Sequence, residues 1–390
     1  MDDSLRLKNI NRRTILNYIY RHPCSTKKEL SEVTGLTFMT AKNVIDDLLK
    51  KGLVSAASDE GKPRRDKSVK WQINSKYGYT VGVHVNIYQT IAAVMDLNGS
   101  ILNLCVLPSN PDLNNPVTFV NQIYNIIKRI LIDVDSAFGK FIGIGISLPG
   151  PIDSEQGMIL TPPNIQGIHY LKLADYIKKE FQVPVILEKD TNAIAWGEFR
   201  YNAENIPENS TMIYIDADAG IGSGIILDGR LYRGNRFKAG EFGHMLCDIT
   251  GPVCNCGRKG CLEVIASGIA VCRDYSAHLL SDIPSPHAPS LSDIFERAAE
   301  NDILAVSLLN TSAKHMGESI ASLQQMIDAD YIVLGGALTR QYGPYFDIVR
   351  SSLPGIRLIH ASADNSAAVR GLGDLLVNKY LSESDAILQD

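Results

Sequence analysis

The chain has 390 residues, of which 45% are hydrophobic and 21% charged, with a formal net charge of -5. This length is typical of about two to four domains, and no apolar run approaches the roughly 20 residues of a membrane-spanning helix. We therefore expect a globular protein without a membrane segment. The first residues lack the apolar core of a secretion signal, so we expect a cytoplasmic protein with reduced thiols.

Charge is distributed unevenly along the chain. Residues 1–76 contain 16 lysines and arginines against 9 aspartates and glutamates, a formal charge of +7. The remaining 22 basic and 34 acidic residues give residues 77–390 a charge of -12. A small basic segment before a large acidic one indicates that the first contacts nucleic acid, while the second repels the phosphate backbone.

The basic segment predicts three helices followed by a hairpin. Apolar residues at helical spacing predict a helix over residues 9–21. The run Thr26-Lys27-Lys28-Glu29 is a capping box that begins a second helix, and Thr37 is a suitable N-cap for a third, which extends to about Lys51. Extended segments at residues 52–54 and 71–73 complete the hairpin.

The third helix and the hairpin loop carry the candidate DNA contacts. The apolar stripe of this helix, in which we include Leu49, faces the core. The predicted DNA-binding residues are Phe38, Thr40, Lys42, Asn43, Lys62, Arg64 and Arg65. Three helices and a hairpin resemble a winged helix-turn-helix, whose third helix enters the major groove while basic side chains reach the minor groove. The alternative is a three-helix module that docks to another protein.

From residue 79 onward, short β-branched runs alternate with helical patterns. The predicted strands cover residues 80–85, 90–95, 101–106, 141–147, 184–187, 212–215 and 331–334. The predicted helices cover residues 116–132, 171–180, 263–280, 302–326 and 367–381. We interpret this order as a mixed α/β fold of two similar lobes. The proline-containing stretch 281–293 predicts an exposed insertion.

Four residues form a candidate metal site: His244, Cys254, Cys256 and Cys261. Three thiolates and an imidazole are the tetrahedral set that zinc prefers, and the intervening glycines allow the tight fold that this set needs. Four protein ligands leave no position for a reactive water, so we expect a structural zinc. The alternative is a redox-inert thiol cluster.

Several motifs resemble those of the ROK family of sugar kinases and sugar-responsive repressors. They are Thr161-Pro162-Pro163-Asn164, Glu188-Lys189-Asp190-Thr191-Asn192, Gly220-Ile221-Gly222, Glu241-Phe242-Gly243-His244 with the cysteine cluster, and Cys261-Leu262-Glu263. The resemblance covers about residues 79–380. It implies an actin-like (ribonuclease H-like) two-lobed domain over residues 77–390, with lobes at about 79–195 plus the C-terminal helix and about 196–370. The winged helix-turn-helix of residues 1–76 is what the repressors of the family carry.

The resemblance also implies roles for single residues. Those implied to bind the sugar are Asn164, Asp190, Glu241, His244 and Glu263. Asp190 lies where the family's kinases hold the base that takes a proton from the sugar hydroxyl. A site that discriminates among sugars needs several fixed polar groups, because a buried partner left unpaired is costly. His244 would face the sugar and also bind zinc, so that the metal fixes the pocket.

Two departures from the kinase pattern bear on activity. The family's kinases have an Asp-x-Gly-Gly-Thr loop that approaches the ATP phosphates, whereas this chain has His84 at the acidic position and Asn86-Ile87-Tyr88 in place of Gly-Gly-Thr. Lys189 replaces the usual asparagine before the base. Its cation could pair with Asp190 or Glu188, attract an anionic sugar, or lie in solvent.

We therefore predict a DNA-binding repressor without enzyme activity. Its effector is a small sugar or sugar phosphate, its cofactor structural zinc, and its partner a palindromic double-stranded DNA operator bound by a homodimer or a tetramer. No catalytic residue is predicted, although Asp190 is retained. The alternative is an ATP-dependent sugar kinase with an appended DNA-binding domain, which Asp190 favours and the altered loop opposes.

Overall fold

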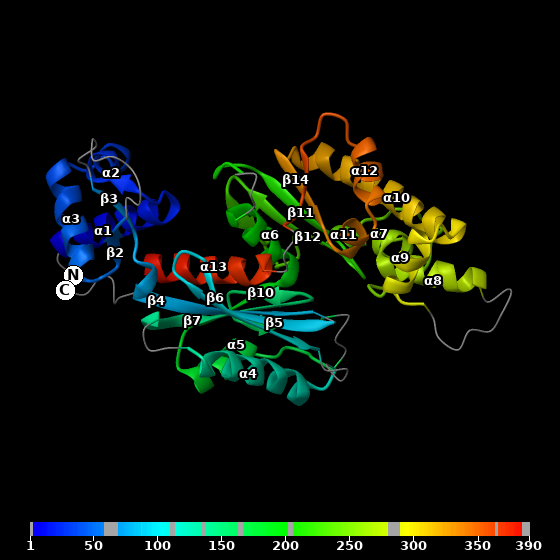
Figure 1. The fold of residues 1–390 in the computed structure, drawn as a ribbon, viewed down its shortest axis with the longest axis horizontal. Coiled ribbons are helices and arrows are strands. Elements are labelled where there is room, and N and C mark those ends of the chain that lie inside the picture. Colours follow the sequence, from blue (N-terminus) through cyan, green and yellow to red (C-terminus); the bar gives the residue numbers. More distant parts are fainter. Residues whose placement is uncertain are drawn as a thin grey trace.

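The computed structural model describes residues 3–57, 69–86, 88–109, 114–134, 138–162, 167–201, 206–279, 289–362 and 366–383. An N-terminal head adjoins a body of two lobes, and the C-terminal helix contacts both the head and the body (Figure 1). None of the described helices is long and apolar enough to cross a membrane. Four residues with predicted roles lie outside the described ranges: Lys62, Arg64, Arg65 and Asn164.

The head consists of three helices and a small sheet. Its elements are α1 (Asp3–Arg21), β1 (Ser25–Thr26), α2 (Lys27–Thr34), α3 (Phe38–Lys50), β2 (Val54–Ala56) and β3 (Lys70–Ile73). The predicted capping box begins α2, where the Thr26 side chain accepts a hydrogen bond from the Glu29 amide, and Thr37 caps α3. β3 pairs with both other strands, so the wing is a three-stranded sheet instead of a two-stranded hairpin.

Two details of the head differ from the prediction. α1 begins at Asp3 and not at residue 9. Leu49, which we assigned to the apolar stripe of α3, is exposed. The buried residues of α3 are Ala41, Val44, Ile45 and Leu48. These complete the i, i+3, i+4, i+7 pattern, and Leu49 lies one residue beyond it, turned away from the core.

The first lobe is a five-stranded sheet covered on both faces. In sheet order its strands are β10 (Val185–Lys189), β7 (Lys140–Leu148), β4 (Gly78–Val85), β5 (Gln89–Asp96) and β6 (Ile101–Pro108). β4, β5 and β6 are antiparallel neighbours, whereas β7 is parallel to β4 and to β10. α4 (Pro116–Ile132) and α5 (Leu173–Phe181) cover one face, and α13 (Ala367–Glu383) covers the other (Figure 1). β8 (Ile152–Asp153) and β9 (Met158–Ile159) form a short hairpin.

The second lobe repeats this topology. In sheet order its strands are β13 (Arg230–Tyr232), β12 (Ile221–Leu227), β11 (Met212–Ala217), β14 (Tyr331–Gly335) and β15 (Leu358–His360). Three are antiparallel neighbours and two join in parallel, as in the first lobe. The helices of this lobe are α7 (Leu262–Ala266), α8 (Gly268–Leu279), α9 (Leu291–Ala299), α10 (Ile303–Ile327), α11 (Ala337–Gln341) and α12 (Pro344–Ser351). As predicted, the two lobes are similar.

The helix predicted over residues 263–280 is wrong as a single element. Ser267, between α7 and α8, has an extended backbone (φ -76°, ψ 165°). The Gly268 amide donates to the carbonyl of Asp218 at 2.8 Å, so it is not available for a helical bond to the preceding turn. A contact with the turn that follows β11 therefore divides the pattern into two helices.

α6 (Asp190–Tyr201) joins the two lobes and was not predicted. It packs against the second-lobe sheet on one side and against α13 on the other, and residues 191–193 and 195–199 are all buried. A helix buried on nearly all sides has no apolar stripe, which removes the signal that reveals a surface helix. Gly197 and Gly371 bring α6 and α13 together: a Cβ on either would overlap a backbone carbonyl oxygen of the other helix.

We predict that Gly197→Ala destabilises the protein by about 1–3 kcal/mol or more, because the added methyl group collides with the Ala367 carbonyl oxygen. The measurement is the midpoint of urea unfolding followed by circular dichroism. Gly343→Ala is the matched control, since a Cβ there has no neighbour within 4 Å, and its effect should stay within about 0.5 kcal/mol. Equal effects of the two substitutions would contradict the proposed backbone contact.

Candidate functional site

A cavity of about 400 Å³ lies between the two lobes. Its walls come from β4, the end of β10, the start of α6, β11, the turn before β12, and α11. Four of the residues predicted to bind a sugar line it: Asp190, Glu241, His244 and Glu263. The fifth, Asn164, lies outside the described residues. Residues that are 73 positions apart in the sequence thus meet in one cleft.

The carboxylates of this cleft are held by their surroundings. Asp190 is the first residue of α6, and its Oδ1 accepts a hydrogen bond from the Thr191 amide at 2.7 Å. Glu263, in the first turn of α7, accepts one from the Ile221 amide at 3.2 Å. Each carboxylate retains oxygen lone pairs that can accept a hydrogen bond from a hydroxyl group.

Lys189 is buried and pairs with Glu241, a pairing that we did not predict. Its Nζ donates to Glu241 Oε1 at 2.8 Å and to the Gly240 carbonyl at 3.2 Å. Glu188 instead pairs with Arg233 at 2.7 Å. The interpretations of Lys189 as a solvent-exposed side chain, or as a partner of Glu188 or Asp190, are therefore wrong, because its charge is compensated by Glu241.

His84 takes the place of the acidic residue of the kinase loop. It is buried on β4, and its Nδ1 lies 3.0 Å from Ser147 Oγ. Burial lowers the pKa of His84, and the charge of Asp190 partly opposes this change. Asn86 Oδ1 accepts hydrogen bonds from the amides of Tyr88 and Gln89, so side chains build the turn where the kinases have glycines.

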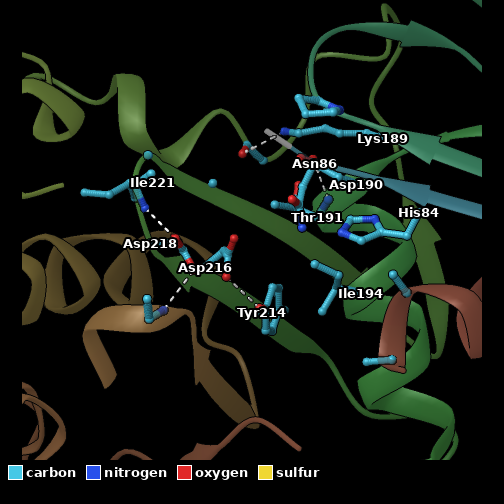
Figure 2. A pocket seen from close by; sticks show the side chains of 18 of the residues that line it. His84, Asn86, Lys189, Asp190, Thr191, Ile194, Tyr214, Asp216, Asp218 and Ile221 are labelled. Atoms are coloured by element: carbon cyan, nitrogen blue, oxygen red, sulfur yellow. Dashed lines mark hydrogen bonds between the residues drawn. The ribbon is translucent and has the colours of Figure 1, made fainter. Parts of the chain in front are cut away.

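Asp216 and Asp218, which were not predicted from the sequence, lie across the cleft from His84 (Figure 2). Asp218 accepts hydrogen bonds from the Ala219 amide at 2.7 Å and from the Ala337 amide, at the start of α11, at 2.9 Å. Burial, and then the charge of Asp218, raise the pKa of Asp216 to about 7. The signal available in the sequence was the pair of acidic residues at the end of a strand, just before the glycine-rich turn.

The four predicted metal ligands meet beside the cleft. One donor atom from each of His244, Cys254, Cys256 and Cys261 lies within 4.8 Å of all the others. His244 Nδ1 is 3.6 Å from Cys254 Sγ, and Cys256 Sγ is 3.6 Å from Cys261 Sγ. Gly257 and Gly260 have positive φ angles of 85° and 67°, which allow the chain to turn all three sulfurs inward. This donor set fits zinc.

His244 belongs to both sites through its two ring nitrogens. Nδ1 faces Cys254, and Nε2 lies 3.7 Å from Glu241 Oε2, in the cleft. The Arg258 side chain also donates to the His244 carbonyl at 2.8 Å, which ties the cysteine loop to this residue. Any cation held by the cluster would fix the ring that faces Glu241.

The start of α3 presents a mostly exposed surface on the head. Phe38, Lys42 and Asn43 are exposed, as predicted, and Thr40 is half-buried, with its hydroxyl 2.9 Å from that of Thr37. Met39 is also exposed and was not among the predicted residues.

Comparisons with known proteins identify both parts of the chain. The sequence profile of the ROK family matches residues 80–376, and a profile described as winged helix-turn-helix DNA-binding matches residues 8–55. A xylose repressor of Bacillus spizizenii is 27% identical over 391 residues, which cover 97% of this chain and 98% of the relative. An N-acetylmannosamine kinase of Haemophilus influenzae is 32% identical over 234 residues, covering 60% of this chain and 74% of the kinase.

Solved structures share the fold. A ROK family transcriptional regulator, described as a homologue of the E. coli MLC protein, has a TM-score of 0.79 and 24% identity, with 98% of both chains covered. A ROK family glucokinase from Streptomyces griseus, in complex with glucose and AMPPNP, has a TM-score of 0.67 and 26% identity, covering 76% of this chain and 99% of the kinase. The predicted fold, a winged head on an actin-like body, is confirmed. The chain belongs to the ROK family.

Proposed function

We propose that this protein is a sugar-responsive transcriptional repressor. The head binds an operator, the cleft binds a sugar, and two copies read a roughly palindromic site. The observation that carries the proposal is a DNA-binding head joined to a cleft of altered composition. The cleft keeps Asp190, Glu241 and Glu263, the carboxylates implied to face the sugar, but places the carboxylate of Asp218 where a phosphate would bind. The near full-length match to a xylose repressor supports it.

The alternative, an ATP-dependent sugar kinase, rests on the retained Asp190. Phosphate sites are built from backbone amides that point at the anion. Here the carboxylate of Asp218 occupies the amides of Ala219 and Ala337, and Asp216 lies beside it. Two carboxyl groups at this position oppose the approach of a nucleoside triphosphate, because their negative charge repels its phosphates. The match to the kinase relative covers 60% of this chain, whereas the match to the xylose repressor covers 97% of it, which supports the repressor.

The charges of the cleft favour a neutral sugar over a sugar phosphate. Its carboxyl groups are Asp190, Glu198, Asp216, Asp218, Glu241 and Glu263. Lys189 pairs with Glu241, and Arg340 lies 3.9 Å from Asp218, so both cations are compensated by acidic partners. A phosphate group would enter an environment with excess negative charge. Because two of the relatives are xylose repressors, xylose is the first sugar to test.

We predict that a neutral sugar raises the melting temperature of the protein, whereas its phosphate ester and ATP with magnesium do not. A ligand at 100 times its dissociation constant stabilises the native state by about 2.7 kcal/mol. The measurement is a thermal-shift series with xylose, glucose, N-acetylmannosamine and the corresponding phosphates. Asp190→Asn should abolish the shift, and Glu296→Gln, an exposed carboxylate on α9, should leave it unchanged. Sugar-dependent ADP release that Asp190→Asn abolishes would establish the kinase instead.

We predict that Lys42→Ala weakens binding to DNA from upstream of the protein's own locus and lowers the salt dependence of that binding. Loss of one phosphate contact reduces the slope of log K against log salt by about 0.9. Fluorescence anisotropy at several salt concentrations measures it. Lys314→Ala removes the same charge from an exposed position on α10 and should change neither quantity. An equal loss in both variants would show that α3 does not contact the DNA.

We predict that Cys256→Ser loses zinc and, with it, sugar affinity, by about 10-fold or more, because His244 is then no longer fixed beside Glu241. Metal content by mass spectrometry and sugar binding by calorimetry are the two measurements. Cys24→Ser, an exposed thiol on the head, is the control. Normal sugar affinity in a zinc-free Cys256→Ser protein would contradict the link through His244.

A further inference from the structure

One buried carboxylate joins the head to the body. Asp374 on α13 is 1% exposed. Its donors are Tyr20 Oη at 2.8 Å, Trp196 Nε1 at 2.8 Å, Arg200 Nε at 3.2 Å, Tyr201 Oη at 3.4 Å, and Asn378 Nδ2. Tyr20 belongs to α1 of the head, whereas Trp196, Arg200 and Tyr201 belong to α6. Because a buried carboxylate is stable only with its hydrogen bonds made, these donors fix the position of α1 relative to α6 and α13.

α6 extends from this carboxylate to the cleft. Its first residue, Asp190, lines the cavity, and so do Ile194 and Glu198, one and two turns further on. Its last turn carries Arg200 and Tyr201. A helix of 12 residues spans about 18 Å, so the two ends of one rigid element lie in the cleft and beside the head. The backbone contact of α6 with α13 prevents the two helices from sliding independently.

The same end of α6 also contacts the second lobe and, through it, the head. Arg200 Nη1 lies 3.6 Å from Glu208 Oε1, in the segment before β11. The other oxygen of Glu208 lies 3.7 Å from His22 Nε2 in the head. The core of the head, in contrast, packs against α13 through Val377 and Leu381. A rotation of the second lobe therefore changes the contacts at Arg200 and His22, so that the head turns about its apolar contact with α13.

We propose that Tyr20, Asp374 and Arg200 transmit sugar binding in the cleft to the DNA-binding head. The inference rests on the proposed function and adds the route of regulation. A sugar held by Asp190 tilts α6 about its backbone contact with α13, together with the second lobe; the bonds of Arg200 and Tyr20 to Asp374 rearrange, and the head changes its orientation. These are positioning residues, since none of them lines the cleft or belongs to α3.

The test is Tyr20→Phe, which removes the hydroxyl that donates to Asp374 and keeps the ring. Operator affinity is measured with and without saturating xylose, glucose or N-acetylmannosamine, each tested separately, and sugar affinity is measured alone. Allosteric ratios are typically about 5- to 150-fold. We expect the ratio of the two operator affinities in Tyr20→Phe to fall toward 1, with sugar affinity and sugar-free operator affinity each within about 2-fold of wild type.

Tyr345→Phe is the matched control. Its hydroxyl is also buried, lies 3.1 Å from Ser312 Oγ within the second lobe, and contacts neither α6 nor the head. This variant should keep the wild-type ratio. A Tyr20→Phe protein with the full ratio would overturn the proposal, and so would a folded one that loses sugar affinity, since the hydroxyl would then serve the cleft itself.

A second variant covers the case in which Tyr20→Phe does not fold. Arg200→Gln removes the bond to Asp374 and the pair with Glu208 from the α6 side, and the same fall of the ratio is expected. A full ratio in Arg200→Gln overturns the route through α6. If none of the three sugars changes the operator affinity of the wild type, the proposed function is wrong, and the coupling proposal is wrong with it.

Discussion

Direct contact between the backbones of α6 and α13 determines how the parts of this protein are arranged. The contact exists because Gly197 and Gly371 lack side chains at the point where each helix meets a carbonyl oxygen of the other. α6 packs on the second-lobe sheet, and α13 covers the first-lobe sheet and supports the head. Two sheets with separate cores, and a head whose core includes Val377 and Leu381 of α13, are thereby connected through one helix pair.

In the proposed repressor, the cleft is a binding site without the chemistry that the kinase relatives are named for. The groups that would orient a sugar are present, including the residue at the position of the kinase base. The phosphate half differs in both lobes: Asn86 stabilises a turn in the first lobe, and Asp218 occupies backbone amides in the second. Loss of catalysis in such a site requires no change of fold, because phosphoryl transfer depends mainly on positioning and charge neutralisation of the phosphates.

Much of the fold could be predicted from the sequence, because the strands, the surface helices and the capping box of α2 follow local patterns. α6 could not, since burial on nearly all sides removes the helical periodicity. The metal cluster was accessible because Cys254, Cys256 and Cys261 are close in sequence. The pairing of Lys189 with Glu241 was not, because it depends on how two segments 52 residues apart meet in space. The same holds for Asp218, whose partners are the amides of Ala219 and Ala337.

The carboxylate of Asp218 has a consequence for what the protein can report. A sugar kinase uses both a sugar and a nucleotide, and the ROK family glucokinase was solved with glucose and AMPPNP together, so the state of such a protein depends on the supply of both. Here the Asp218 side chain already accepts hydrogen bonds from the amides of Ala219 and Ala337. In a repressor whose cleft admits a sugar and no nucleotide, as we propose, sugar occupancy and the gene expression under its control follow the nutrient supply and not the energy state of the cell.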